Sequence, residues 1–221
     1  MSHTVTIKNA RPVTHDVRQF DFEKPEGYEF TPGQATMVSI NKEGWKDEKR
    51  PFTFTSLNED PYLQFTIKIY EEHDGVTEQI GQLEEGDQFL IGNPWGAIQY
   101  KGPGVFLAGG AGVTPFIAIL RKLHTDDKIN GNRLIFSNKT EKDIILEEEF
   151  REMLGDDFIN VITRQETDEY LNGYIDKAFL EKHIDDYNQP FYICGTPDFV
   201  DDMKQYLKEL GADPGGLVFE E

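Results

Sequence analysis

Residues 104–125 read GVFLAGGAGVTPFIAILRKLHT and join a short apolar run to a segment with a helical pattern. The run at residues 104–110 predicts a buried strand. In the segment that follows, Ile117, Leu120 and Leu123 share one face of a helix. A near-continuous apolar strand that leads into a helix is typical of an α/β domain with a parallel sheet.

The chain after this unit keeps alternating strands with helices. Further strands are predicted at residues 132–138, 160–164 and 190–196, and further helices at residues 147–154, 178–183 and 197–210. This alternation indicates a parallel sheet covered by helices on both faces. The Lys-Gly-Pro-Gly break at residues 101–104 suits a boundary, so we expect an α/β domain at residues 102–221.

Before this boundary the pattern consists of short strands separated by turns. Strands are predicted at residues 5–8, 17–22, 36–40, 51–56, 63–70 and 87–92, with one short helix at residues 77–83. Several of the strands alternate polar and apolar residues with period two. Short, evenly spaced strands of this kind favour an antiparallel sandwich or barrel at residues 1–101.

Charge and cysteine content exclude several classes of protein. The 221 residues include 22 Lys and Arg against 41 Asp and Glu, a net charge of −19, which argues against nucleic acid or an anionic membrane as partner. A single cysteine excludes an internal disulfide, a multi-thiolate zinc site and a protein-bound iron–sulfur cluster. The first ten residues lack the apolar core of a secretory signal, so we expect a cytoplasmic protein. The five histidines show no ligand spacing, and no metal site is predicted.

The glycine-rich turn is the strongest local signal of a binding site. Glycines let backbone N–H groups approach a ligand, and the helix that follows adds unpaired donors and the positive end of its dipole. A pyrophosphate is therefore the expected ligand, although Pro115 occupies the third glycine position of the usual dinucleotide fingerprint. A tight turn without a ligand is the alternative. The candidate residues are Gly110, Ala111, Gly112, Val113, Thr114 and Pro115.

Two weaker signals lie elsewhere in the chain. Arg50, Phe52 and Thr53 offer a phosphate-binding cation, a flat apolar ring and a hydroxyl on one extended segment, which is also consistent with an ordinary strand. Cys194 ends the last predicted parallel strand, at the sheet edge where ligands of α/β domains bind. A buried cysteine is, alternatively, a small apolar filler.

Together and in this order, the signals resemble the ferredoxin-NADP reductase superfamily, in its compact flavodoxin/ferredoxin reductase form. The resemblance rests on residues 30–34, on Arg-Pro-Phe-Thr at 50–53, on 65–70 with 75–77 and 83–87, on the glycine motif at 109–115, and on Cys-Gly-Thr-Pro at 194–197. It implies a flavin-binding antiparallel barrel at residues 1–101 and a nucleotide-binding α/β domain at residues 102–221.

The resemblance also implies roles for individual residues in the barrel. Arg50 would bind the flavin pyrophosphate, Phe52, preceded by Pro51, would pack on the flavin, and Thr53 would lie near flavin N5. Backbone groups would line the ring and phosphates at Ile67, Lys68 and Ile69, and further pyrophosphate donors would come from Gly75, Val76 and Thr77. Phe52 replaces the tyrosine of the family motif, which keeps a stacking surface and loses a phenol hydrogen bond.

In the second domain, the resemblance implies that the glycine motif and Cys194, Gly195, Thr196 and Pro197 bind the nicotinamide dinucleotide, with Cys194 beside the nicotinamide. Arg164 would favour NADPH over NADH, and Tyr70 and Trp95 as adenine-stacking candidates weakly favour FAD over FMN. Phe219 and Glu220 could correspond to a C-terminal aromatic and a catalytic glutamate of relatives, or could belong to a solvated acidic tail.

The implied activity is hydride transfer from NAD(P)H to FAD, followed by electron transfer to a separate acceptor such as ferredoxin, flavodoxin or an oxygenase component. One alternative is an electron-transfer subunit of a multicomponent oxygenase or dehydrogenase. Another is a regulatory nucleotide-binding module without flavin, against which the pair Arg50 and Thr53 argues. The sequence leaves the acceptor, the physiological direction and the oligomeric state open.

Overall fold

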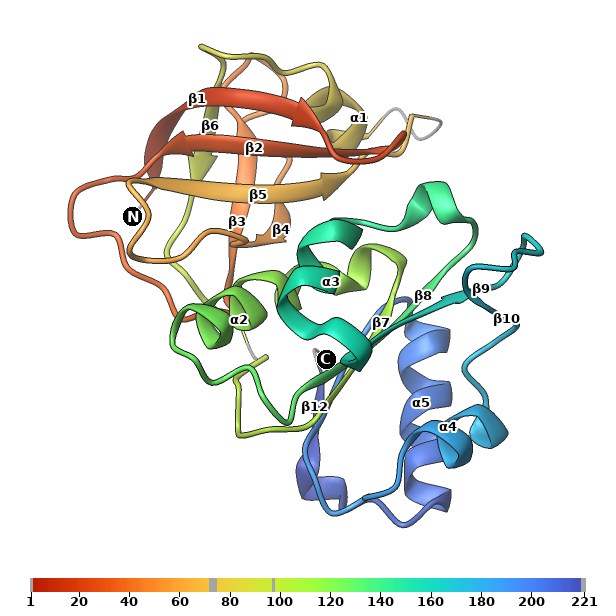
Figure 1. The fold of residues 1–221 in the computed structure, drawn as a ribbon. Coiled ribbons are helices and arrows are strands. Elements are labelled where there is room, and N and C mark those ends of the chain that lie inside the picture. Colours follow the sequence, from red (N-terminus) through yellow and green to blue (C-terminus); the bar gives the residue numbers. More distant parts are fainter. Residues whose placement is uncertain (1, 72–74, 97, 220–221) are drawn as a thin grey trace.

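The computed structural model describes residues 2–71, 75–96 and 98–219, and it contains two sheets of different kinds (Figure 1). The first sheet is antiparallel, with strand order β4-β3-β6-β1-β2-β5. Its two edge strands approach each other through a bridge between Phe54 and Phe65, so the sheet curls into a nearly closed barrel. The strands are β1 (His3–Pro12), β2 (Val17–Glu23), β3 (Ala35–Ile40), β4 (Arg50–Thr53), β5 (Tyr62–Lys68) and β6 (Gln88–Ile91), and one short helix, α1 (Val76–Gly81), follows β5.

Aromatic side chains fill the barrel. Phe20, Phe22, Phe54, Phe65 and Phe89 are all fully buried, and neighbouring rings lie 4.6–6.1 Å apart. Full burial of one phenylalanine side chain stabilises the folded state by about 1.5–3 kcal/mol relative to leaving it exposed. The alternation of the strand sequences thus places one set of side chains inside the barrel and leaves the other set outside, where polar groups can face the second domain.

The second sheet is parallel throughout, with strand order β10-β9-β8-β7-β11-β12. Its strands are β7 (Val105–Gly109), β8 (Arg133–Asn138), β9 (Phe158–Ile162), β10 (Leu171–Asn172), β11 (Phe191–Cys194) and β12 (Leu217–Phe219). Its helices are α2 (Thr114–Thr125), α3 (Glu147–Leu154), α4 (Lys177–His183) and α5 (Pro197–Glu209), and the 3-10 turns are η1 (Gly110–Val113), η2 (Glu141–Asp143), η3 (Gly155–Asp157) and η4 (Pro214–Gly216). The predicted pair of an antiparallel barrel and a parallel α/β domain is therefore confirmed.

Helix α2 lies between the parallel sheet and the barrel (Figure 1). The sequence pattern predicts one apolar face, yet every residue from Pro115 to Leu120 is buried. The reason is that α2 packs on the sheet with one side and meets the barrel with the other. Helices α2 and α3 share one core with the barrel-facing side of the sheet, whereas α4 and α5 cover its opposite side.

Two short strands escape the sequence patterns. β10 has two residues and β12 has three, and each pairs with only one neighbour at an edge of the parallel sheet. In β12, Val218 is buried, so residues 217–219 are not the solvated tail that was one reading of the sequence. Among the described residues, no helix is long and apolar enough to cross a membrane.

Candidate functional site

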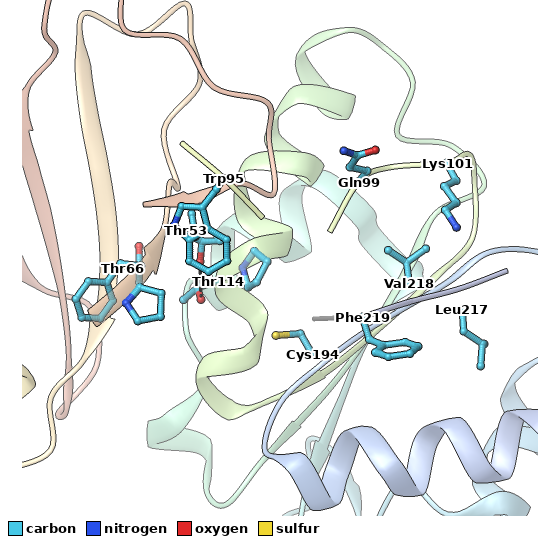
Figure 2. A pocket seen from close by; sticks show the side chains of 14 residues that line it. Thr53, Thr66, Trp95, Gln99, Lys101, Thr114, Cys194, Leu217, Val218 and Phe219 are labelled. Carbon is cyan, nitrogen blue, oxygen red and sulfur yellow. Dashed lines mark hydrogen bonds between the residues drawn. The ribbon is translucent and has the colours of Figure 1, made fainter. Parts of the chain in front are cut away.

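A cleft of about 670 Å³ opens between the two domains. The barrel side contributes β4 and β5, and the α/β side contributes the start of α2 and the ends of β11 and β12 (Figure 2). Its lining residues are Ala35, Pro51, Phe52, Thr53, Thr66, Trp95, Gln99, Lys101, Thr114, Pro115, Cys194, Leu217, Val218 and Phe219. The fold thus brings three predicted motifs, distant in sequence, to one cavity.

Thr53 and Thr114 meet across this cleft. The Thr53 hydroxyl, at the end of β4, donates a hydrogen bond to Thr114 Oγ1 at 3.2 Å, and Thr114 in turn donates to the carbonyl of Ala111 at 3.0 Å. Thr114 begins α2, with Pro115 at the first turn, where a missing N–H costs no helical hydrogen bond. The contact joins the barrel directly to the glycine-rich turn.

The glycine-rich turn packs against the end of β11. A Cβ at Gly112 would lie 2.3 Å from the carbonyl oxygen of Cys194 and 2.6 Å from Cα of Gly195, so only glycine fits there. Gly110 has φ +54°, a left-handed conformation that glycine adopts without strain, and the space in front of its Cα is open. This packing brings Cys194 to the same side of the sheet as the start of α2.

The Cys-Gly-Thr-Pro segment divides between the cleft and the helix that follows it. Cys194 lines the cleft, whereas Gly195 packs on the Phe199 ring, which a Cβ would approach to 2.6 Å. Thr196 caps α5 by accepting a hydrogen bond from the Phe199 N–H at 3.4 Å, and Pro197 occupies the first turn. Thr196 and Pro197 therefore have a local reason for their residue type in addition to the ligand role predicted for them.

The cations predicted to hold phosphates are not among the cleft-lining residues. Arg50 begins β4, is half exposed, donates to the Lys49 carbonyl at 2.8 Å and lies 3.8 Å from a Glu48 oxygen. Arg164 is exposed just after β9, and its backbone N–H donates to the carbonyl of Lys139. Both guanidinium groups remain accessible to a ligand at the surface.

Lys68 has an acidic partner in the barrel. Its Nζ lies 2.5 Å from an Asp16 oxygen. Partial burial raises the pKa of Asp16, but the hydrogen bonds from Lys68 and Thr14 and the charges of Lys68 and His15 together lower it by more, so the net shift is downward. The Lys68 side chain is thus held in this pair, and the ligand role predicted for the backbone of Lys68 stays a prediction.

The remaining predicted barrel residues surround the end of β5 and the start of α1. Ile67 and Ile69 are buried, with Ile69 packed against Gly81 of α1. Gly75 precedes α1, and Val76 and Thr77 form its first turn. Glu220 lies outside the described residues. Phe219 lines the cleft, and the Lys204 ammonium lies 4.1 Å from the centre of its ring.

Some lining residues were not predicted to face this cleft, although Thr66 falls within the flavin segment 65–70 and Trp95 was a candidate for stacking on adenine. Thr66 lies in β5 between two residues of the barrel core and points outward, as alternation requires. Trp95 pairs with Ala35 through two backbone hydrogen bonds of 2.7 Å, and it starts the segment that carries Gln99 and Lys101 along the cleft. Trp95, a candidate for stacking on adenine from the sequence, is 47% exposed, a high fraction for a large aromatic side chain.

One group of possible metal ligands forms at the interface of the domains. His15 Nε2 lies 3.7 Å from an Asp16 oxygen and 3.9 Å from an Asp143 oxygen. Both carboxylates already have other partners, because Asp16 pairs with Lys68 and Asp143 accepts hydrogen bonds from Thr140. The prediction of no metal site therefore stays a prediction.

The residues of the cleft suit flat ring systems. Its volume is in the range of small-molecule sites, which are mainly apolar with a few polar groups that fix orientation. Here Phe52, Pro115 and Phe219 supply apolar surface, and the Thr53 and Thr114 hydroxyls supply the polar groups. A flavin ring and a nicotinamide suit these apolar surfaces and hydroxyl groups. The open space at Gly110 permits close approach of a phosphate.

Comparison with protein families assigns both halves of the chain. Residues 4–100 match the oxidoreductase FAD-binding domain, and residues 106–205 match the oxidoreductase NAD-binding domain. The chain therefore joins an oxidoreductase FAD-binding domain to an oxidoreductase NAD-binding domain. The two domains implied by the five motifs are thereby confirmed, and FAD and a nicotinamide dinucleotide are the cofactors of such domains.

Curated relatives of this chain include reductases of several systems. It is 29% identical over 222 residues to NADH-cytochrome b5 reductase 2 of Mycosarcoma maydis, covering 89% of this chain and 62% of the relative. It is 28% identical to the glycine betaine monooxygenase reductase subunit of Chromohalobacter salexigens, covering 96% and 61%. The chain thus spans about six-tenths of the length of these two relatives.

Solved structures share the fold over the whole chain. A ferredoxin NADP+ reductase from Neisseria gonorrhoeae with bound FAD and NADP superposes with a TM-score of 0.87 at 22% identity, covering 99% of this chain and 98% of that one. The cytochrome b5 reductase domain of Ulva prolifera nitrate reductase gives a TM-score of 0.86 at 21% identity, covering 99% and 97%. At these identities the likeness concerns the fold.

Proposed function

We propose that this chain is an FAD-dependent NAD(P)H reductase that takes hydride from the nicotinamide and passes electrons to a separate acceptor. The observation that carries the proposal is the single cleft in which Thr53 of the barrel meets Thr114 and Cys194 of the α/β domain. We place the boundary between an FAD-binding domain and an NAD(P)-binding domain at residues 101 and 102. FAD, when bound, supplies the redox chemistry, accepting a hydride and releasing electrons one at a time.

The cleft residues orient the two rings and hold water away from them. Thr53 offers its hydroxyl to the flavin ring, and Phe52, next to Pro51, offers a flat apolar surface. Thr114 and Cys194 position the nicotinamide on the opposite side, where the Thr53–Thr114 hydrogen bond fixes the separation of the two walls. Holding the two reactants in a fixed geometry is worth several kcal/mol of activation free energy, about 7–11 at best.

Groups around the cleft would bind the phosphates. Arg50 and the backbone at Gly75, Val76 and Thr77 are assigned to the flavin pyrophosphate, and the backbone of Ile67, Lys68 and Ile69 to the ring and ribityl side. The glycine turn, residues 110–113, is assigned to the nicotinamide dinucleotide. Support comes from the exposure of the Arg50 guanidinium and the open space at Gly110. Glu220 remains a candidate for proton handling.

The choice between NADPH and NADH rests on Arg164. An exposed arginine after β9 suits a 2′-phosphate, and we propose NADPH as the preferred donor, with NADH also accepted. The relative from Mycosarcoma maydis is named an NADH reductase, so a preference for NADH is the alternative hypothesis. Arg164→Ala decides between them, because only a 2′-phosphate contact predicts a loss with NADPH that spares NADH.

The acceptor is proposed to be a separate protein, such as a ferredoxin, flavodoxin or oxygenase component, met in the cytoplasm. Reductase components of oxygenases among the relatives support this class of partner. The net charge of −19 argues against broad electrostatic steering of an acidic acceptor. Lys42 and Arg50, near the flavin motif, both lie close to carboxylates, Asp87 at 2.9 Å and Glu48 at 3.8 Å.

Anaerobic mixing of the FAD-reconstituted protein with NADPH or NADH tests the function. We expect the protein to retain FAD and its visible flavin absorbance to bleach on mixing. Cys194→Ser should retain FAD but bleach more slowly, since it alters the nicotinamide wall of the cleft only. A protein that stays colourless after reconstitution, or that is reduced by neither nucleotide, would refute the proposal.

A further inference from the structure

Helix α2 is bonded to the barrel at a second point, two turns beyond Thr114. Arg121 Nη1 donates to the Thr55 carbonyl at 2.5 Å and to Gln64 Oε1 at 2.8 Å, both in the barrel. Its Nε and Nη2 donate to the two carboxylate oxygens of Glu149 in α3, at 2.5 and 2.8 Å. One guanidinium therefore ties two helices of the α/β domain to the barrel.

The barrel side of this contact is a buried polar network. Gln64 Oε1 also accepts hydrogen bonds from Gln19 Nε2 at 2.8 Å and from the Thr55 hydroxyl at 3.0 Å. The same Gln19 amide donates to Thr66 Oγ1 at 3.0 Å, and Thr66 lines the cleft. Thr55, Gln64, Gln19 and Thr66 are each at most 4% exposed. A contact made by Arg121 is thus connected to the cleft wall through fully buried side chains.

The spacing of the contacts aligns helix and strand. Thr114 and Arg121 are seven residues apart, so they lie on nearly the same side of α2. Thr53 ends β4 and Thr55 follows it by two residues, so both barrel contacts of α2 lie at the same end of this strand. The Thr53 and Thr114 hydroxyls meet across the cleft at 3.2 Å, and Arg121 reaches the backbone carbonyl of Thr55 at 2.5 Å.

From this arrangement we infer that Arg121 is a positioning residue that sets the distance between the flavin wall and the nicotinamide wall of the cleft. The inference rests on the proposed function. Arginine suits the task because its planar fork can satisfy Glu149 with two donors and still direct a third to the barrel. Apolar residues of α2 already pack against the barrel, and the directional hydrogen bonds at Thr114 and Arg121 fix the helix at two points about two turns apart.

Arg121→Met tests the inference, with Lys122→Met as the matched control. Lys122 is the next residue of α2 and also reaches the barrel domain, through Glu59 at 2.7 Å, but this pair is exposed. We expect Arg121→Met to slow flavin reduction at saturating nucleotide by on the order of 100-fold, the cost of a small misplacement of reactants. Lys122→Met should stay within about twofold of wild type. FAD content and the nucleotide concentration for half-saturation should change little in both variants.

A second readout does not depend on turnover. In the flavin-free protein, hydrogen–deuterium exchange should rise in Arg121→Met at residues 114–121 and 53–56 and stay unchanged in Lys122→Met. The inference fails if Arg121→Met is reduced at the wild-type rate, or if it only loses FAD while its flavin-loaded fraction reacts normally. If Arg121→Met does not fold, Arg121→Lys and Glu149→Gln, which keep polar side chains in place, are judged by the same two measurements.

The test of Arg121 and the test of the proposed function can fail independently. If wild-type protein is reduced by neither nucleotide, the proposed function fails, and the exchange experiment alone still decides whether Arg121 joins the domains. If wild-type protein is reduced and both measurements on Arg121→Met match it, the positioning role fails while the function stands.

Discussion

The cleft and the outer surface hold their candidate residues in different ways. In the cleft, Thr53, Thr114 and Cys194 are fixed by hydrogen bonds, by helix α2 and by the packing of Gly112. On the surface, Arg50 and Arg164 are exposed and have room to move. From this difference we expect that the fold itself orders the groups proposed for the rings, whereas the groups proposed for the phosphates become ordered on ligand binding.

The strongest test of the ordered side is Gly112→Ala. Its Cβ would meet backbone atoms of Cys194 at 2.3 and 2.5 Å, so the turn and β11 must separate. We expect a loss of about 1–3 kcal/mol in the free energy of unfolding from overpacking. Flavin reduction should slow on the order of 100-fold, because the nicotinamide wall moves. Urea unfolding and stopped-flow bleaching measure the two effects.

Gly92→Ala is the control for this substitution. The nearest atom to its added Cβ would be the Thr36 hydroxyl, at 3.4 Å, an ordinary contact. Both measurements should stay near wild type. If Gly112→Ala behaves like Gly92→Ala, the cleft is not held by this packing and the contrast between the two regions disappears.

On the surface side, Arg50→Ala should weaken FAD binding without weakening the fold. Loss of a charge-assisted hydrogen bond to phosphate costs about 1.5–3 kcal/mol of binding free energy. The unfolding free energy of the flavin-free protein should change by less than about 0.5 kcal/mol, since the side chain is half exposed. Titration of apoprotein with FAD, with Lys49→Ala as the neighbouring control, gives the affinity. An unchanged FAD dissociation constant would remove Arg50 from the pyrophosphate site.

The smallest effect expected is the loss, at acidic pH, of the stability that the ion pair between Asp16 and Lys68 provides. The folded pKa of Asp16 lies below its ordinary value of 3.8, so the folded state holds the proton more weakly than the unfolded state. The stabilisation is therefore complete above pH 3.8 and is lost as the pH falls through the lower, folded value. A partly exposed pair of this kind contributes at most about 1 kcal/mol.

Asp16→Asn measures this contribution. The variant should be slightly less stable than wild type at neutral pH, and the two should converge below pH 3.8. Thermal unfolding across this range gives the comparison. A stability difference that does not depend on pH would show that Asp16 acts through packing and not through its charge.

The sequence predicted the fold wherever a pattern was long enough to carry information. Alternation in the barrel strands and the apolar runs of the parallel strands were sufficient, and the helix over α2 was recognised from its period. β10 and β12 were missed because strands of two and three residues are defined by the neighbour they pair with. The burial of α2 on all sides was missed because its second contact is with another domain.

The candidate site divides in the same way. Thr53, Thr114 and Cys194 stand in motifs, and the structure brings them into one cleft. Thr66 lies within the predicted flavin segment 65–70, but its place in the cleft was not predicted because it depends on the closure of the barrel against α2. Arg121 was missed because its partners, Thr55 and Gln64, are 57 or more positions away in sequence and only tertiary packing brings them within hydrogen-bonding distance.

The chain contains one cysteine, and that cysteine lines the cleft. Covalent labelling of cysteine with an alkylating reagent therefore modifies a single, known position, in the cleft that Cys194 lines together with Pro115 and Thr53. If the nicotinamide binds beside this sulfur, as we propose, NADP+ or NAD+ should slow alkylation of Cys194, and the comparison needs neither a spectroscopic cofactor nor turnover.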